Sequence, residues 1–560
     1  MSRRLCLIVL AACSSAPKAS TTRPEGTAGF DDLVGRVTGH LFALEPASAV
    51  RLGHHEHDGT LPDRSPGELA RMAAQLEQDR AALEAQTALS PSQAFERDVL
   101  VQEVRRVRFD LVDLDVFRTN PMAYSGAINL DAYIIRDYAP LAERAAAVIK
   151  LCTNLGPYLA QARANLQAPI PRTWIDTALL QTRGYIEFAD KDVRAELATT
   201  PAIGPALDAC KAALTEHATW LEQRQPQGTT AFATGEARYL KMLLDSQGVD
   251  TQLATLTTLA DEDLRRNSAA MEEAARAIDP RRPVAAIVLQ LANEKPAADQ
   301  ILATATSQAE QMRAFLTEHK IVSIPSAEIA LVRESPPFMR WNAAFLNSPG
   351  AFERKQLPSF YYISPPDPKW PLAEQQSYIM PRADLLYVTI HEVWPGHFLH
   401  GLHVRKHPSR TLQSFCTYST NEGWAHYTEE MMFEAGAGGH TPQARVGMLK
   451  EALLRNVRFV AALGLHTKGM TVEQAQRLFE DKAFVDPGNA RQQAVRGTFD
   501  PMYLSYTLGK LMIRKLAADW MQRHPGATRG EFHDALLSHA CAPLPLIRRS
   551  MLGADAGPPL

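Results

Sequence analysis

Apolar residues recur at three- and four-residue spacing along most of the chain between residues 30 and 333. This spacing places apolar side chains on one face of an α-helix, with charged residues on the other faces. Proline-containing breaks at 168–171 and 279–283 separate neighbouring helices. The clearest periods predict helices over residues 69–83, 94–114, 141–166, 207–221 and 253–278. The pattern therefore predicts a mainly α-helical scaffold.

The pattern changes between residues 334 and 381, where prolines and aromatic residues are both frequent. Proline removes a backbone donor and clashes with the preceding helical turn, so long helices are not expected here. Residues 357–364 are rich in aromatics and flanked by proline, which predicts a short strand. One interpretation is that this segment lines a cleft and binds an extended peptide by strand addition. The other is that it forms a rigid connector packed by its own aromatic side chains.

Two short motifs farther along the chain carry the residue types of a metal site. The first, HEVWPGH, covers residues 391–397, and the second, NEGWAHYTEE, covers residues 421–430. Zinc in hydrolases is commonly held by two histidines and one glutamate, which leaves a position for water. A separate glutamate can then act as general base toward that water. The motifs predict His391, His397 and Glu422 as ligands and Glu392 as the base.

The histidine spacing requires a break in the helix. His391 and His397 are six residues apart, and on a straight helix they would point about 120° away from each other. Pro395 cannot donate to the carbonyl of His391 and clashes with it, while Gly396 relaxes the backbone beside it. We therefore expect the helix to break there and His397 to swing back toward His391. His400 is the alternative second histidine ligand.

The second motif predicts a helix that begins near Glu422 and is capped by residues 419–421. Glu422, His426 and Glu429 are four and three residues apart and share one helix face. A ligand histidine usually donates its second ring N–H to a carboxylate, and Glu429 is the candidate for that role. His426 is predicted to contact substrate or a developing oxyanion. The alternative is that this polar face is simply solvated.

Together the motifs resemble a known family. His-Glu-x-x-Pro-Gly-His followed by Glu-Gly-Trp-Ala-x-Tyr-x-Glu is similar to the family catalogued as domain of unknown function 885, with weaker similarities at 46–53, 235–239, 334–337 and 506–509. That family is grouped with helical zincin peptidases and is similar in outline to the carboxypeptidase Taq and angiotensin-converting-enzyme types. The resemblance implies a mainly α, gluzincin-type peptidase fold with a deep cleft and a small β element beside the metal helix. It also implies one Zn²⁺ per chain, whereas the substrates of the family are largely undefined.

The C-terminal region supplies further candidates. Amphipathic helices are predicted over residues 445–469, which ends near His466, and over residues 499–520. Related helical zincins place a tyrosine near the metal, where a phenol stabilises the oxyanion. The resemblance favours Tyr506 over Tyr503 for this role, with packing as the alternative. Arg496 and His466 are weaker candidates for substrate contacts.

The composition of the chain excludes several classes of binding partner and of active site. The 560 residues carry 59 Lys and Arg against 62 Asp and Glu, a net charge of −3 that gives no electrostatic basis for binding nucleic acid. The six cysteines are scattered, which argues against a disulfide framework and against a cysteine-ligated zinc site. The chain also lacks the Gly-x-Ser-x-Gly elbow of serine esterases and the phosphate loop of nucleotide-binding enzymes.

The N-terminus indicates export. A short basic start is followed by an apolar run and by Leu10-Ala11-Ala12-Cys13, which resembles a bacterial lipobox. Residues 1–13 are therefore predicted to be a lipoprotein signal with Cys13 as the lipidated residue, and 14–29 a flexible tether. An ordinary cleaved signal, which leaves a soluble periplasmic or secreted protein, and a mis-assigned start are the alternatives. Residues 30–560 are predicted to form the catalytic domain, as one unit or two lobes, with the metal site in 385–510.

These observations predict an exported, lipid-anchored, helical zinc hydrolase, most simply a metallopeptidase acting on peptides or small amides. Two alternatives are open. The first is a catalytically silent periplasmic binding protein on the same fold. The second is a metal-dependent hydrolase of non-peptide amides or esters. The sequence does not decide between endo- and exopeptidase action, and it leaves the oligomeric state open.

Overall fold

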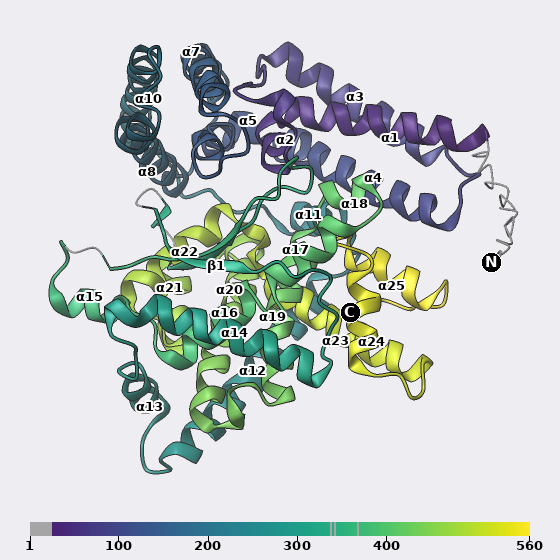
Figure 1. Cartoon of the computed structure of the whole chain (residues 1–560), viewed down its shortest axis with the longest axis vertical. Helices are drawn as coiled ribbons and strands as arrows, with labels where there is room; N and C mark the ends of the chain where they lie inside the picture. Colours follow the sequence, from purple (N-terminus) through teal and green to yellow (C-terminus); the bar gives the residue numbers. More distant parts are fainter. Residues whose placement is uncertain (1–24, 337–338, 341–342, 367–368) are drawn as a thin grey trace, which may run out of the picture.

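The computed structural model describes residues 25–336, 339–340, 343–366 and 369–560 (Figure 1). The predicted signal peptide, its Cys13 and the first part of the predicted tether lie outside these residues. The predicted end of the tether at residue 29 is wrong, because helix α1 (Glu25–Leu44) begins earlier. Phe30, Leu33 and Val37 lie on one face of α1 and are buried. The apolar period that starts at Phe30 is thus part of a helix that extends upstream of it.

The N-terminal helices pack around a first hydrophobic core, drawn in purple and blue at the top of Figure 1. Most of its buried residues lie between Leu33 and Leu221. The helices predicted from periodicity are present, and the one predicted over 94–114 ends in a π-helical turn, η2 (Phe109–Asp113). The elements are α2 (Pro46–Leu52), η1 (His55–His57), α3 (Pro66–Glu84), α4 (Pro91–Arg108), α5 (Val116–Thr119), α6 (Met122–Ser125), η3 (Leu130–Tyr133), α7 (Leu141–Asn165), α8 (Arg172–Phe188), η4 (Ala189–Val193), α9 (Arg194–Glu196), α10 (Ile203–Arg224) and η5 (Gln225–Gln227).

The remaining helices surround a second hydrophobic core, whose buried residues run mostly from Tyr239 to Ala556. Its first members are α11 (Glu236–Gln247), α12 (Leu253–Ile278), α13 (Val284–Leu291), η6 (Ala298–Gln300) and α14 (Ile301–His319). After the sheet come α15 (Leu372–Tyr378), α16 (Arg382–Glu392), α17 (His397–Lys406), α18 (Arg410–Ser414), α19 (Tyr418–Ala435), η8 (Ala437–His440), α20 (Pro442–Thr467), α21 (Val472–Ala483), α22 (Pro487–Phe499), η9 (Pro501–Leu504), α23 (Ser505–Arg523), α24 (Arg529–Leu537) and α25 (Leu544–Leu552). The predicted mainly α fold is confirmed, and it is built on two cores.

A three-stranded sheet lies between the two groups of helices (Figure 1). Its strands are β1 (Ala330–Glu334), β2 (Ala344–Asn347) and β3 (Ser359–Ile363), in the order β1-β3-β2. β3 pairs with β1 in parallel and with β2 antiparallel, so β2 is an edge strand. The strand predicted over 357–364 is confirmed as β3, and the small β element expected from the family resemblance is present.

Two predicted helix starts are wrong. Helix α19 begins at Tyr418, so Glu422 lies in its second turn, and its N-cap is Thr417 rather than a residue of 419–421. The start of α19 is instead held by tertiary contacts, since the Thr417 N–H donates to the carbonyl of Cys541 at 2.9 Å. The helix predicted over 499–520 begins at Ser505, because Pro501 favours a separate 3₁₀ turn, η9, before it.

Two of the scattered cysteines, Cys416 and Cys541, form a disulfide. The prediction against a disulfide framework did not foresee this bond, because the two cysteines are 125 residues apart in sequence and meet only through the fold. Cys416 lies just before α19, so the disulfide ties the start of that helix to the C-terminal region. The other two cysteines in the described residues, Cys152 and Cys210, are free and buried.

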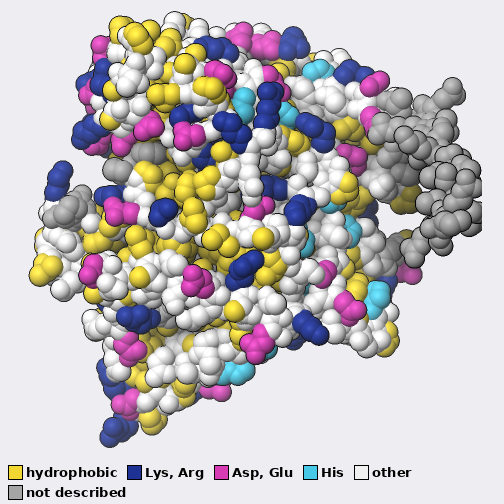
Figure 2. Space-filling view, in the orientation of Figure 1, with side chains coloured by type: hydrophobic (Ala, Val, Ile, Leu, Met, Phe, Trp, Pro, Cys, Tyr) yellow, Lys and Arg dark blue, Asp and Glu magenta, His cyan; other side chains and the backbone are white. Residues whose placement is uncertain are grey.

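The surface is mixed in charge. Figure 2 shows side chains of both signs interspersed over the face that it draws, with hydrophobic side chains gathered along the band of the sheet. Within the described residues, no helix combines the length and the apolar character needed to cross a bilayer.

Helices α19 and α23 cross at two glycines. A Cβ added to Gly509 would lie 2.0 Å from the Ser419 carbonyl oxygen and 2.7 Å from the Gly423 Cα. A Cβ on Gly423 would lie 2.5 Å from the Gly509 Cα. The neighbouring atoms are backbone and cannot rotate away, so the distance between these two helices depends on both glycines.

We therefore expect Gly509→Ala to lower the free energy of unfolding by about 3 kcal/mol or more, because the added methyl group overpacks a backbone contact. A thermal melt measures this as a lower unfolding temperature. Gly184→Ala is the matched control, since Gly184 lies inside α8 and a Cβ there meets no atom within 4 Å. That variant should gain about 0.5–1 kcal/mol from helix propensity. Equal stability of Gly509→Ala and wild type would contradict the close crossing.

Candidate metal centre

The first histidine motif spans a break between two helices. α16 ends at Glu392 and α17 begins at His397, so the predicted break at Pro395 is confirmed. The reversal is tight, because the Gly396 N–H donates to the Ile390 carbonyl at 3.0 Å and a Cβ on Gly396 would lie 1.8 Å from the His391 carbonyl oxygen. Glycine is therefore required at this position. The break brings His391 and His397 onto the same side.

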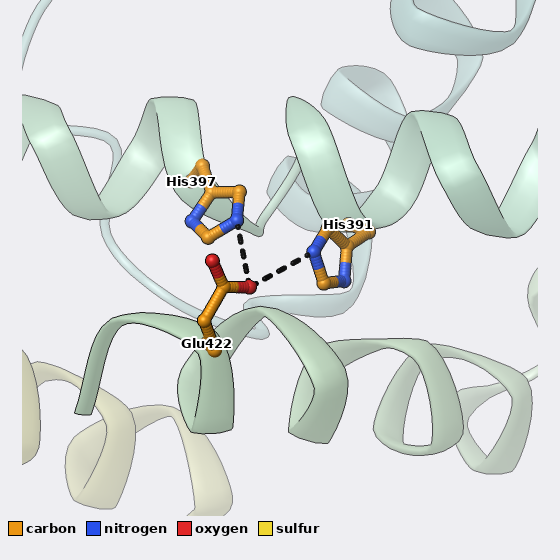
Figure 3. Close-up of side chains that lie close together, drawn as sticks. All are labelled: His391, His397 and Glu422. Carbon is orange, nitrogen blue, oxygen red and sulfur yellow. Dashed lines mark ion pairs between the residues drawn. The ribbon is translucent and has the colours of Figure 1, made fainter. Parts of the chain in front are cut away.

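Both imidazoles face Glu422, which comes from α19 (Figure 3). Its Oε2 lies 3.4 Å from His391 Nε2 and 3.3 Å from His397 Nε2. One potential ligand atom from each of the three residues lies within 4.8 Å of the other two. The structure thus brings the three predicted ligands together.

His400 does not belong to this group. It lies on α17 about one turn beyond His397, is buried, and its Nε2 donates to the carbonyl of Ala540 at 3.0 Å. Burial lowers the pKa of His400 to about 4. Its ring therefore serves a contact between α17 and the C-terminal region, and His397 is the histidine placed opposite His391.

The three residues fit a zinc ion by distance and by chemistry. In a tetrahedral zinc site with bonds of about 2.0–2.1 Å, neighbouring ligand atoms lie about 3.3–3.4 Å apart. Both distances to Glu422 Oε2 match this spacing. That oxygen is buried and has no hydrogen-bond partner among the described residues. An unpartnered carboxylate oxygen between two imidazole nitrogens is the arrangement that a divalent cation would satisfy.

The ionisation of Glu422 suits the same role. Burial alone would raise the pKa of this carboxyl group, but the close imidazoles of His397 and His391 outweigh burial. The pKa of Glu422 is therefore held well below its ordinary value. The carboxylate is anionic at neutral pH, as a metal ligand must be.

Glu429 lies behind His391 and orients it. His391 Nδ1 donates to Glu429 Oε1 at 2.6 Å, which leaves Nε2 directed at Glu422. This is the usual arrangement of a ligand histidine and a supporting carboxylate. Burial lowers the pKa of His391, but the nearby carboxylates of Glu422 and Glu429 outweigh it and raise that pKa to about 9. The two carboxylates thus favour a positive charge at this point.

The polar face of α19 is buried, so the alternative of a solvated face is wrong. Glu429 and His426 are each 1% exposed, and His426 Nδ1 lies 3.3 Å from Glu429 Oε2. Arg455 of α20 approaches the other oxygen of Glu429 at 3.4 Å. Burial raises the pKa of Glu429, but Arg455 and then His426 outweigh it and lower that pKa far below its ordinary value. The structure thus places His426 against Glu429, the carboxylate that also binds His391.

A buried polar network underlies this layer. Lys510 of α23 is fully buried and lies 3.0 Å from Asp263 of α12 and 3.4 Å from Glu430 of α19. Burial raises the pKa of Asp263, but Lys510 and Arg266 outweigh it and lower that pKa to about 2. The network joins three helices that are distant in sequence. Nothing in the local sequence around Lys510 signals that it is buried.

The predicted base, Glu392, is held by the edge of the sheet. The Leu346 N–H of β2 donates to Glu392 Oε2 at 2.9 Å. β2 is in turn held by Arg136, which donates to the Asn347 carbonyl at 2.7 Å and to the Pro358 carbonyl at 3.0 Å. Sequence reasoning missed both Leu346 and Arg136, because a backbone donor on a strand edge and a loop arginine have no local signature.

Tyr506, and not Tyr503, lies beside the three converging residues. The Tyr506 ring is nearly parallel to the His391 ring, with centroids 6.3 Å apart. Burial raises the pKa of Tyr506, so its phenol keeps the proton at neutral pH. Tyr503 is fully buried and packs against Gly497, where a Cβ would lie 2.3 Å from the phenol oxygen. The choice of Tyr506 on the family resemblance agrees with this placement.

Arg496 and His466 occupy different surroundings. Arg496 pairs with Asp500 at 2.8 Å and donates to the Tyr418 hydroxyl at 3.0 Å, and the Tyr418 ring is 5.8 Å from that of Tyr506. It is therefore close to the site. His466 is 1% exposed and its Nε2 donates to the Gly497 carbonyl at 2.7 Å, which joins α20 to α22. The structure gives His466 a packing contact away from the converging residues.

A cavity of about 620 Å³ lies between the two groups of helices. Arg106 and Asp110 line it from the N-terminal group, and Tyr418 and Asp500 line it from the side of the site. Tyr418 neighbours Tyr506, whereas none of His391, His397 and Glu422 lines this cavity. The deep cleft expected from the resemblance therefore stays a prediction.

A family model described as a bacterial protein of unknown function, DUF885, matches residues 46–551. The chain belongs to the DUF885 family. No curated protein matches its sequence. The motifs that carried the resemblance, at 391–397 and 421–430, lie within the matched range.

Two solved structures share the fold of this DUF885 protein. One is a candidate lipoprotein of unknown function from Shewanella oneidensis, at 23% identity and a TM-score of 0.79, covering 93% of this chain and 99% of the other. The second is a candidate lipoprotein from Colwellia psychrerythraea, at 16% identity and a TM-score of 0.81, covering 93% and 98%. An M32 carboxypeptidase from Deinococcus radiodurans R1 is far less similar, at 12% identity and a TM-score of 0.41, covering 94% and 97%.

Proposed function

We propose that this DUF885 protein is a zinc-dependent hydrolase, most simply a metallopeptidase. The observation that carries the proposal is the convergence of His391, His397 and Glu422 on one point at the spacing of zinc ligands. Zinc bound there would polarise a scissile carbonyl and lower the pKa of water. The protein's own residues would supply the remaining functions, which are proton transfer, oxyanion stabilisation and substrate alignment.

Glu392 is the proposed general base. It directly follows His391 in sequence, and its Oε2 accepts the Leu346 N–H at 2.9 Å. This bond fixes the carboxylate while its second oxygen can take a proton from the attacking water. The same carboxyl group can then pass the proton to the leaving amine. The presence of this base beside the three residues favours a hydrolase over a catalytically silent binding protein.

Tyr506 is the proposed oxyanion donor. Its raised pKa keeps the phenol protonated, and its ring lies parallel to that of His391. A phenol O–H held near the reaction centre can donate to the oxygen on which negative charge develops.

The β2 edge favours peptides among the possible substrates. In β2, the Leu346 N–H points away from β3, toward Glu392, so this edge of the strand faces the site. An extended peptide can pair with such an edge through its main chain. Hydrolysis of non-peptide amides or esters is the alternative, and it would make no use of this edge.

We further propose that the protein is exported and anchored through Cys13. The lipobox-like Leu10-Ala11-Ala12-Cys13 supports this, as does the description of both structural relatives as candidate lipoproteins. Lipidation at one cysteine would hold the enzyme at the periplasmic face of a bacterial membrane. A soluble periplasmic or secreted form is the alternative.

The metal site is tested by elemental analysis of purified protein after zinc reconstitution. We expect about one zinc per chain in wild type and its loss from His391→Ala and Glu422→Ala, because each variant removes one of three ligands. His403→Ala is the control, since His403 lies on α17 but binds the Ser323 carbonyl instead. It should keep its zinc. Wild type without stoichiometric metal would remove the basis of the proposal.

The base is tested with Glu392→Gln. This variant should keep its zinc and its fold but lower kcat on a cleaved peptide by about 10²–10⁴-fold, because the amide cannot accept the proton. A peptide library, screened with and without chelator, identifies the substrate for the assay. Glu434→Gln, on the exposed face of α19, should leave the rate unchanged. Full activity in Glu392→Gln would assign the base to another residue.

The anchor is tested in cells with Cys13→Ser. Wild type should incorporate labelled palmitate and sediment with membranes, and the variant should lose both properties because the acylated thiol is gone. Soluble, unlabelled wild type in the periplasm would instead indicate an ordinary cleaved signal.

A further inference from the structure

Arg458 is a buried arginine beside the site that lacks a counter-charge. Its side chain on α20 is 7% exposed, and its Nε donates to the neutral Gln493 side chain at 2.9 Å. In the described part of the chain, no carboxylate forms an ion pair with Arg458. Its terminal guanidinium nitrogens have no protein partner there either.

The two neighbouring arginines differ from Arg458 in this respect. Arg455, one turn earlier on α20, pairs with Glu429 and Glu451. Arg496 of α22 pairs with Asp500. Of the guanidinium groups around Tyr506, Arg458 is therefore the one whose charge remains uncompensated.

An uncompensated buried charge is unfavourable for folding, since desolvation is not offset by an opposite charge. Burial, together with the charges of Arg496 and Arg455, lowers the pKa of Arg458. The same features make it a receptor for an anion. A guanidinium offers two parallel N–H donors that match the two oxygens of a carboxylate, and the bond is strongest where water is excluded.

The position of Arg458 relates it to the proposed reaction. Its guanidinium carbon lies 4.8 Å from the Tyr506 ring centroid, and that ring lies 6.3 Å from the ring of His391. Tyr506 is therefore a shared neighbour of the uncompensated cation and of the converging ligands. One residue of extended chain spans about 3.3–3.6 Å. A carboxylate one or two residues from the scissile bond is within reach of this arrangement.

We propose that Arg458 binds the C-terminal carboxylate of a peptide substrate, so that the enzyme removes one residue or a short fragment from a free C-terminus. This inference rests on the proposed peptidase function and deepens it. The proposal commits to a terminal carboxylate, and the peptides below distinguish it from an acidic side chain. Arg458 is thereby a specificity-determining residue.

The experiment compares matched peptides with a free C-terminal acid and a C-terminal amide. Zinc-loaded wild type should show a kcat/KM at least about tenfold higher for the acid, which corresponds to about 1.4 kcal/mol. Arg458→Gln should lose this preference through a higher KM for the acid, with the amide unaffected. Arg445→Gln, on the same helix but paired with exposed Glu273, should keep the preference. A third peptide, amidated and carrying an internal Asp, tests side-chain carboxylates.

Two further measurements distinguish a role of Arg458 in substrate binding from a role in folding. Arg458→Gln should unfold at a temperature no lower than wild type, since it removes an uncompensated charge. Arg458→Lys keeps the charge without the planar fork, and it should give an intermediate preference. If Arg458→Gln does not fold, Arg458→Lys carries the comparison. Equal cleavage of acid and amide by wild type, or equal loss on both in Arg458→Gln, would overturn the assignment.

A binding measurement tests the carboxylate-binding role of Arg458 independently of the proposed hydrolase activity. Calorimetric titration of zinc-loaded Glu392→Gln with N-acetyl-Ala-Ala, as acid and as amide, measures recognition without turnover. Tighter binding of the acid that disappears in the Glu392→Gln/Arg458→Gln double variant supports the anchor even if wild type cleaves no peptide. Cleavage of peptides without any acid preference would retain the hydrolase and reject the anchor. Efficient cleavage of the Asp-containing amide would assign the charge to a side chain instead.

Discussion

The hydrogen bond between His391 and Glu429 is the interaction on which the site depends. It joins α16 to α19, fixes the imidazole so that Nε2 faces Glu422, and requires a carboxylate in a fully buried position. Burying that carboxylate is unfavourable unless positive charge compensates it. Arg455 on α20 supplies the compensation, so a third helix is drawn into the same arrangement. The glycine crossing of α19 with α23 then brings Tyr506 beside the His391 ring.

Further buried ion pairs connect the helices that surround this hydrogen bond. Lys510 lies between Asp263 and Glu430, so α12, α19 and α23 share one buried cation. Such a network is stable only when every member has a partner, because a lone buried charge destabilises the fold. Among the buried cations of the described residues, Arg458 is an exception to this pairing, and it lies next to the proposed reaction centre. Proteins break their local packing rules mostly at functional sites, which is why this exception is informative.

The sequence predicted those parts of the site that depend on local chemistry. The helical periods, the break at Pro395 and the grouping of His391, His397 and Glu422 follow from spacing, backbone sterics and the family resemblance. The start of α19 at Tyr418 could not be predicted, because it depends on contacts with Cys541 rather than on a capping side chain. The disulfide and the Leu346–Glu392 hydrogen bond likewise join residues that only the fold brings together. Long-range contacts leave no periodic trace in one sequence.

The N-terminal helices do more than cover the core, since they hold the strand that holds Glu392. Arg136 binds the end of β2 and the start of β3, and His55 Nε2 lies 3.1 Å from Glu353 in the loop between these strands. The loop also approaches closely at Gly53, where a Cβ would lie 2.5 Å from the Glu353 nitrogen. The hairpin is thus clamped from the N-terminal side while its free edge faces Glu392. Because a carboxylate acts as a base only in the right position, the first half of the chain contributes to the proposed chemistry through β2.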